Sequence, residues 1–363
     1  MTVALGVIGT SWWADAMYLP ALANSQATVM AVAGRNQART DDFASRWGVA
    51  NACASSEELL SIEDLEAVVI ASPNDTHYQL ALEALERGLH VLCEKPLALD
   101  LDQARTLVAT AGRAGAITMV PFTYRFMPTN QWVKRLIDDG FIGQPYHLDL
   151  RYFTGFARAG EYNWRFDQGR SGSGVLGDLG SHWLHLARWL FGDIVSISAQ
   201  AHTFVKRQPR PDGTPYTPTE DWATMTVRFA SGAVGNLQVS AVAHAGDGFG
   251  QTHHLDAHGS GGTLHAINDW SRTQCVSGLR SDEPGPAYEL PVPDDVWGMA
   301  RRESVHDTYR DVFRHNGAMV GDFVDAVAEG RPCEPDFAEG LRVQKLLDAA
   351  LRSIAQDGRM VTV

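Results

Sequence analysis

Short apolar runs alternate with amphipathic segments along the first 120 residues of the chain. Runs at 3–8, 28–33, 67–70, 90–93 and 117–120 have the length of strands, and 67–70 is continuously apolar, as in a strand buried on both faces. The segments between them repeat apolar residues at helical spacing and end at breakers such as glycine. Strands that alternate with helices in this way predict a parallel sheet.

The pattern changes after residue 120. One more helix is expected over 130–139, and the stretches that follow have strand character and are separated by loops or turns. Those stretches are 146–153, 194–204, 223–229, 235–242, 253–257 and 262–267. The proline-rich segment 209–218 predicts an irregular excursion, and helices are expected again over 307–329 and 337–356. These features favour a second domain with a largely antiparallel sheet.

A glycine turn follows the first predicted strand and opens a helix that runs to about residue 23. Residues 9–14 match the pattern G-x-G-x-x-G/A, with Ser11 in place of the second glycine. Gly9 allows the tight turn, and Ala14 is small enough for the helix to pack closely on the strand. The β-carbon of Ser11 would push a bound pyrophosphate outward, while its hydroxyl could donate to a phosphate oxygen. Taken alone, the turn is equally well explained as a tight connection between strand and helix.

The end of the second strand bears on which dinucleotide would bind. Gly34 and Arg35 stand where a carboxylate normally binds the adenosine ribose of NAD, and residues 28–40 contain no acidic side chain. Arg35, with Arg39 one helical turn further on, suits a 2′-phosphate that a carboxylate would repel. The sequence therefore favours NADP(H), with NAD(H) as the alternative. The competing interpretation is that Arg35 is a solvated arginine on a loop.

Two further loops follow strands at the edge where open α/β sheets bind ligands. Ser72, Pro73 and Asn74 come directly after the strand at 67–70, and Glu94-Lys95-Pro96 comes directly after the strand at 90–93. A helix that begins near Asp75 or Thr76 is expected after the first of these loops. We expect the reaction chemistry at Lys95.

The second domain carries an acidic residue and a histidine four positions apart on a predicted helix. Asp178 and His182 would share one face, and His185 lies near the same stripe. Histidine works as an acid or base near neutral pH, and an aspartate one turn away can orient it. The alternative is that Asp178 caps the helix and that His182 is an ordinary, partly buried histidine.

Composition and charge narrow the class of protein. The chain has 363 residues and a net charge of −13, which favours two domains and argues against nucleic acid as a partner. The nearest approach to a basic patch, Lys206, Arg207 and Arg210, lies among prolines in a predicted loop. No segment has the length of a membrane span and no signal peptide precedes the first strand, so we expect a cytoplasmic protein that does not bind membranes. The four cysteines show no C-x-x-C spacing and are expected to be free thiols.

One group of side chains raises the question of a metal site. His254, Asp256 and His258 alternate along a predicted strand and would point to the same face. Three alternating polar residues are more simply the solvated face of a sheet, and no second set of ligands is visible. We therefore expect no metal.

The order and spacing of these features resemble those of the Gfo/Idh/MocA oxidoreductases, the group of glucose–fructose oxidoreductase and inositol dehydrogenase. The resemblance spans nearly the whole chain and includes residues 162–165, the segment 335–344 and the final residues 358–363. It implies an α/β fold with a Rossmann dinucleotide-binding domain at 1–123. The second domain, at 124–363, would be an α/β domain for substrate binding and oligomerisation with a large, mostly antiparallel open sheet. Its C-terminal helices could pack back on the first domain.

The resemblance also assigns roles to residues. Lys95, Asp178 and His182 fall on the catalytic positions of the family, and Tyr124 and His185 join them in the substrate site. His185 stands where many members have an aspartate, so substrate identity does not transfer. The residues assigned to the cofactor are Gly9, Thr10, Ser11, Trp12, Trp13, Gly34, Arg35, Arg39, Ser72, Pro73, Asn74, His77, Glu94, Lys95, Trp164 and Arg165.

The sequence thus predicts an NADP(H)-dependent oxidoreductase that transfers a hydride between nicotinamide and a secondary alcohol or ketone of a sugar, polyol or sugar derivative. His182 would be the base, Asp178 would orient it, and Lys95 would stabilise the alkoxide. Two alternatives stay open, a glycosidase of the same fold that retains its nucleotide and a non-catalytic sugar or nucleotide sensor. A homodimer or homotetramer is expected through the outer face of the second sheet.

Overall fold

The computed structural model describes residues 2–244, 250–314 and 318–363, and the chain divides into two compact units. The first unit contains residues 1–122 and 310–344, and the second contains residues 123–309 and 345–363. The chain therefore enters the first unit a second time near its C-terminus. The last helix, α12 (Phe337–Ile354), begins in the first unit and ends in the second.

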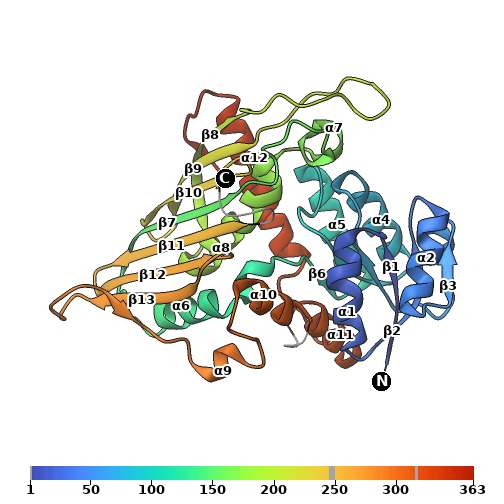
Figure 1. The fold of residues 1–363 in the computed structure, drawn as a ribbon, viewed down its shortest axis with the longest axis horizontal. Coiled ribbons are helices and arrows are strands. Elements are labelled where there is room, and N and C mark those ends of the chain that lie inside the picture. Colours follow the sequence, from blue (N-terminus) through green and yellow to red (C-terminus); the bar gives the residue numbers. More distant parts are fainter. Residues whose placement is uncertain (1, 245–249, 315–317) are drawn as a thin grey trace. The chain divides into compact units, whose positions relative to one another are not determined.

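A six-stranded parallel sheet forms the centre of the first unit (Figure 1), with the strand order β3-β2-β1-β4-β5-β6. This order is that of a Rossmann fold, so the expected parallel sheet is confirmed. All four residues of the central strand β4 are buried, as the continuous apolar run predicted. The strands are β1 (Val3–Ile8), β2 (Ala27–Ala33), β3 (Asn51–Cys53), β4 (Ala67–Ile70), β5 (His90–Cys93) and β6 (Thr118–Met119).

Polar side chains begin several helices of the first unit. The side chains of Asn36, Ser55 and Asp100 each accept a hydrogen bond from the backbone N–H three residues further on, which satisfies one of the free donors of a helix start. The helix α11 packs on β1 and β5 within this unit. The helices are α1 (Leu19–Ala23), α2 (Gln37–Trp47), α3 (Ser56–Leu60), α4 (Asn74–Glu86), α5 (Leu101–Ala114) and α11 (Val320–Glu329).

A nine-stranded sheet forms the second unit, with the order β14-β13-β12-β11-β7-β10-β9-β8-β15. Among the strands described, all neighbours pair antiparallel except β7 and β10, which are parallel, so the expected mostly antiparallel sheet is confirmed. The strands are β7 (Pro145–Thr154), β8 (Ile194–His202), β9 (Trp222–Phe229), β10 (Val234–Ser240), β11 (Gln251–Gly259), β12 (Gly262–Asp269), β13 (Gln274–Arg280), β14 (Tyr288–Glu289) and β15 (Val361–Thr362).

Helices pack against one face of this sheet. The helix α6 (Pro128–Asp138) contacts β12 and β13, and α8 (Ser181–Phe191) contacts β7 and β10 (Figure 1). Burial alternates along the strands, so that Leu148 and Leu150 of β7 are buried while His147 and Arg151 lie on the opposite, outer face. Two short helices, α7 (Gln168–Ser171) and α9 (Asp294–Trp297), complete the unit.

The single helix expected over 307–329 is wrong. The structure has two helices, α10 (Val305–Arg314) and α11, and residues 315–317 between them lie outside the described ranges. Met319, just before α11, has a φ of 55°, which is incompatible with the interior of a right-handed helix. The sequence contains an Asn-Gly pair at 316–317, a dipeptide that is a general breaker signal.

Candidate active site

The glycine turn of the first unit has the geometry that its sequence predicts. Gly9 has a φ of 120°, and an added β-carbon there would lie 2.3 Å from the carbonyl oxygen of Ala71. The hydroxyl oxygen of Ser11 accepts the backbone N–H of Ala14 at 3.2 Å. Ser11 therefore begins the following helix, which passes through a π-helical turn, η1 (Ala14–Tyr18), before it continues as α1.

The end of β2 lies directly against this turn. A β-carbon on Gly34 would be 2.7 Å from the hydroxyl oxygens of Thr10 and Thr40, so only glycine permits the approach. Arg35 and Arg39 are exposed beside it, before and inside the first turn of α2. A helix N-terminus carries partial positive charge, which adds to that of the two arginines and suits an anionic group.

Glu94 ties the Lys95 loop to the glycine turn. Its Oε1 accepts hydrogen bonds from the indole N–H of Trp13 at 2.8 Å and from the hydroxyl of Tyr18 at 2.7 Å. The ring of Trp13 also packs edge-on against Phe313. The sequence predicts that Trp13 and Glu94 contact the cofactor, and the hydrogen bond between them holds each side chain in place. The bond depends on residues 81 positions apart, so no local pattern signals it.

His77, which the sequence predicts to contact the cofactor, is buried inside the first unit. The side chain has no exposed surface, and its two ring nitrogens lie 2.9 Å from the carbonyl oxygens of Ser72 and Pro96. His77 thus bridges the loops that follow β4 and β5, the second of which carries Lys95. Burial lowers the pKa of His77, and the two carbonyl acceptors counter that effect only in part. Asn74 begins α4 instead of Asp75 or Thr76 and is 7% exposed.

In the second unit, Asp178 lies inside a π-helical turn, η4 (Leu176–Gly180), that leads into α8. No side chain caps this turn, so the structure does not support the interpretation of Asp178 as a helix cap. Its Oδ2 lies 3.3 Å from Nε of Arg165. His182 is 6% exposed, and its ring meets the ring of Tyr124 with centroids 4.7 Å apart.

A cluster of aromatic side chains meets His182 through Tyr124. The hydroxyls of Tyr124 and Tyr152 lie 2.7 Å apart, and the ring of His253 contacts both tyrosine rings. Burial raises the pKa of Tyr124 and Tyr152 and lowers that of His253, so all three are uncharged at neutral pH. Tyr124 therefore lies beside His182 with its hydroxyl directed to Tyr152.

His185, which the sequence predicts to join the substrate site, is buried within the second unit. His185 is one turn beyond His182 on α8 and is 1% exposed, so almost none of its ring can be reached.

Trp164 and Arg165 form a short 3-10 helix, η3 (Trp164–Phe166), near Asp178. The side chain of Asn163 accepts the backbone N–H of Arg165 at 3.0 Å, and the guanidinium of Arg165 lies 4.7 Å from the centre of the Trp164 ring. Arg165 is predicted from the sequence to contact the cofactor, and the structure shows in addition its ion pair with Asp178. The pair joins two segments whose spacing carries no signal.

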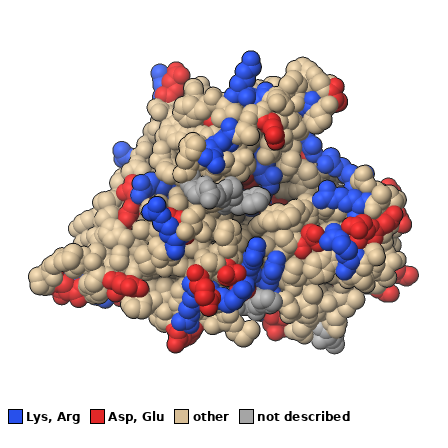
Figure 2. All heavy atoms as spheres, viewed as in Figure 1, with Lys and Arg blue, Asp and Glu red and all other residues tan. Residues whose placement is uncertain are grey.

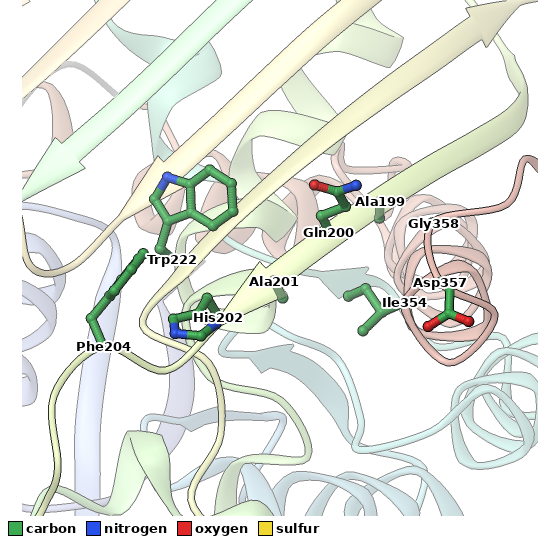
Figure 3. A pocket seen from close by; sticks show the side chains of 9 residues that line it. All are labelled: Ala199, Gln200, Ala201, His202, Phe204, Trp222, Ile354, Asp357 and Gly358. Carbon is green, nitrogen blue, oxygen red and sulfur yellow. The ribbon is translucent and has the colours of Figure 1, made fainter.

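A separate hollow of about 560 Å³ lies in the second unit, beside β8 and β9 (Figure 3). Phe204, Trp222 and His202 gather at one end of it, and Asp357 lies at the other. Within the described residues, its lining includes neither Asp178 nor His182.

The histidines of the metal hypothesis lie on the outer face of the nine-stranded sheet. His265 Nδ1 contacts Asp256 at 2.5 Å, and His258 bonds to Thr263 at 2.9 Å and stacks on His147. Over the described ranges, no group of three or more histidine, cysteine or acidic side chains has an arrangement that could hold a metal ion.

Figure 2 shows lysine and arginine side chains interspersed with aspartate and glutamate on the face in view. No broad basic area forms among the described residues of that face. Of the helices in the described part of the chain, none is long and apolar enough to cross a membrane.

A Rossmann-like unit with a glycine turn, in one chain with a unit that carries an aspartate and a histidine at helical spacing, is typical of nicotinamide-dependent oxidoreductases. Residues 3–122 match the family described as "Oxidoreductase family, NAD-binding Rossmann fold", and residues 130–265 match the "GFO/IDH/MocA C-terminal domain". An uncharacterized oxidoreductase of Synechocystis sp. is 33% identical over 96% of this chain and 92% of its own length. The chain belongs to the Gfo/Idh/MocA oxidoreductase family.

Two further relatives have named activities. The inositol 2-dehydrogenase of Rhizobium meliloti is 27% identical, with 98% of each chain covered. A solved structure of levoglucosan dehydrogenase in complex with NADH and L-sorbose has a TM-score of 0.88 and 26% identity, and the match covers 100% of this chain and 99% of that one.

Proposed function

We propose that the protein is an NADP(H)-dependent oxidoreductase that transfers a hydride between nicotinamide and a secondary alcohol or ketone of a sugar, polyol or sugar derivative. The proposal rests on one observation: neighbouring side chains hold both the Lys95 loop and the Asp178–His182 pair in place. Glu94 and His77 hold the loop of Lys95, while Arg165 contacts Asp178 and Tyr124 contacts His182. Relatives named for a polyol and an anhydrosugar agree with that substrate class.

The reaction divides between the cofactor and the protein. In oxidation, the carbinol hydrogen leaves as a hydride to C4 of the nicotinamide, and the hydroxyl proton passes to a base, so that a carbonyl forms. His182 is the proposed base, and Asp178 orients it. Lys95 donates a hydrogen bond to the same oxygen and stabilises its developing negative charge. The proposal requires Lys95 of the first unit and His182 of the second to reach one substrate oxygen.

A panel of substrates tests the proposal directly. Oxidised and reduced forms of both cofactors are mixed with sugars, anhydrosugars, inositols and keto-sugars, and absorbance of the reduced nicotinamide is followed. Turnover that requires a secondary alcohol or ketone supports the proposal. Bond cleavage without net change in the cofactor would instead indicate the nucleotide-retaining glycosidase. Binding without any reaction would indicate the sensor, but a binding site alone has no need for Lys95, Asp178 and His182.

The preference for NADP(H) rests on Arg35. Replacement of Arg35 by aspartate is expected to weaken NADPH binding by about 1.5–3 kcal/mol, because it removes a charge-assisted contact and introduces repulsion. NADH binding should change little or improve, since a carboxylate there can accept from the ribose hydroxyls. Titration of the tryptophan fluorescence with both cofactors measures the two affinities, and Trp12, which is 60% exposed beside the glycine turn, is a suitable reporter.

Arg46 provides the matched control for this substitution. It lies on the same helix α2 and pairs with Asp15 and Asp42, so Arg46→Asp changes the charge of the helix equally without touching the end of β2. Equal affinity of the unmodified protein for NADH and NADPH would contradict the NADP(H) assignment. The assignment would also be contradicted if the Arg35→Asp variant bound NADH and NADPH with the affinities of the unmodified protein.

We propose that the protein associates through the outer face of the nine-stranded sheet. Phe204 is 62% exposed at the rim of the hollow, and Val234 of β10 is 43% exposed on that face. Association would remove such apolar surface from water. Light scattering at micromolar concentration should give the mass of a dimer or tetramer, and Val234→Asp should lower it. A monomer mass for the unmodified protein would refute this proposal.

A further inference from the structure

Arg165 contacts the aspartate of the proposed catalytic pair. Its Nε lies 3.3 Å from Oδ2 of Asp178, and the side chain of Asp178 is 18% exposed while that of Arg165 is 40% exposed. An ion pair that is partly shielded from water acts more strongly on its neighbours than one on the open surface. The positive charge of Arg165 therefore interacts electrostatically with the carboxylate of Asp178.

Several contacts hold the segment of Arg165 in place. Its backbone N–H donates to Asn163, and its guanidinium packs on Trp164. Two residues further on, Asp167 has no exposed surface and accepts hydrogen bonds from Tyr162 at 3.0 Å and from Arg210 at 2.7 Å. Arg210 belongs to the proline-rich excursion, which thus clamps the short helix that carries Arg165. A segment held in this way can keep the distance between Arg165 and Asp178 constant.

The other titratable groups around the pair come from five elements. Tyr124 precedes α6, Tyr152 lies on β7, His253 lies on β11, Tyr309 lies on α10, and His185 lies on α8 itself. Tyr124, Tyr152 and His253 are uncharged at neutral pH, because burial raises the pKa of the tyrosines and lowers that of the histidine. Arg165 is a charged side chain that forms an ion pair with Asp178.

We propose that Arg165 is a positioning residue that holds Asp178 ionised and offsets its negative charge, so that His182 stays neutral and able to accept a proton. A carboxylate beside an imidazole favours the protonated ring, and a base that is already protonated cannot remove the hydroxyl proton of the substrate. The positive charge of Arg165 opposes that effect of Asp178. The inference deepens the proposed function and rests on it, because it takes His182 as the base.

Histidine titration by NMR tests the inference without a known substrate. The imidazole signals of the full chain are followed with pH, and the signal of His182 is the one that disappears in His182→Asn. Arg165→Met should raise the titration midpoint of His182 by roughly 0.5–1 pH unit, because the variant removes a positive charge beside Asp178. Arg165→Lys, which keeps the charge, should restore most of the original midpoint.

The matched control is Arg188→Met. Arg188 lies on α8 with His182, but its partner is Asp193, at 3.2 Å, so its removal should leave the midpoint of His182 unchanged. Melting curves of all variants show whether each one folds. An unchanged midpoint in a folded Arg165→Met variant overturns the inference, as does an equal shift in Arg188→Met.

A kinetic arm separates this inference from the proposed function. Once a substrate is known, kcat/KM for oxidation is measured over a range of pH. In Arg165→Met the acidic limb of this profile should move to higher pH by the same amount as the NMR midpoint. Weaker cofactor binding with no movement of the limb would assign Arg165 to the cofactor alone and overturn the inference. If His182→Asn retains the acidic limb, His182 is not the base and the proposed function fails, whatever Arg165 does.

Discussion

Replacement of Lys95 by methionine is expected to lower kcat by about 10²–10⁴-fold while the affinity for the cofactor changes little. Methionine keeps the length and apolar stem of lysine but cannot donate to the oxygen on which charge develops. In free-energy terms the loss amounts to about 2.7–5.5 kcal/mol of transition-state stabilisation. Steady-state kinetics with the substrate found in the panel, together with cofactor titration, measures the two effects separately.

Lys345→Met is the control for that substitution. Lys345 is exposed on α12, so the same chemical change there should leave kcat and cofactor affinity as they are. If Lys95→Met turned over the substrate at the unmodified rate, Lys95 would have no part in the chemistry. A loss of cofactor binding equal to the loss of rate would place Lys95 on the dinucleotide instead.

Replacement of His182 by asparagine should also lower kcat about 10²–10⁴-fold, because the variant keeps a similar volume and loses the group that accepts the proton. Asp178→Asn should cost less if Asp178 only orients His182. The measurement is kcat over a range of pH. The His182→Asn variant should lose the fall in kcat at acidic pH that protonation of the base causes.

The exposed residue His202 allows a matched variant, His202→Asn, which should behave as the unmodified protein. Activity of His182→Asn at the unmodified level would mean that His182 is a structural residue of α8. A larger loss in Asp178→Asn than in His182→Asn would reverse the two roles.

The parallel sheet of the first unit is the part of the fold that local sequence predicts best. A strand that is buried on both faces, such as β4, has to be apolar throughout, and the loops after β4 and β5 have to lie at the same edge. The family assignment, the oxidoreductase class and the mostly antiparallel second sheet are confirmed as well.

The contacts that determine the roles of individual site residues could not be predicted from the spacing of residues along the sequence. The two ring nitrogens of His77 lie against carbonyl oxygens, and every residue offers a carbonyl, so no side-chain pattern marks these neighbours. The π-helical turn around Asp178 uses residues that an α-helix accepts equally well, and Arg165 reaches Asp178 from a separate short helix. Burial of His185 follows from the packing of α8 on the sheet, which becomes known only with the fold.

The order in which the chain is synthesised has a consequence for the first unit. Residues 310–344 belong to that unit, and α11, with the buried residues Val320, Phe323 and Val324, packs on β1 and β5. At typical rates of translation, the ribosome needs roughly 10–40 s to make residues 123–309 after it has finished the first 122. During that interval the nascent dinucleotide-binding unit presents an uncovered apolar surface, which is the kind of surface that chaperones bind.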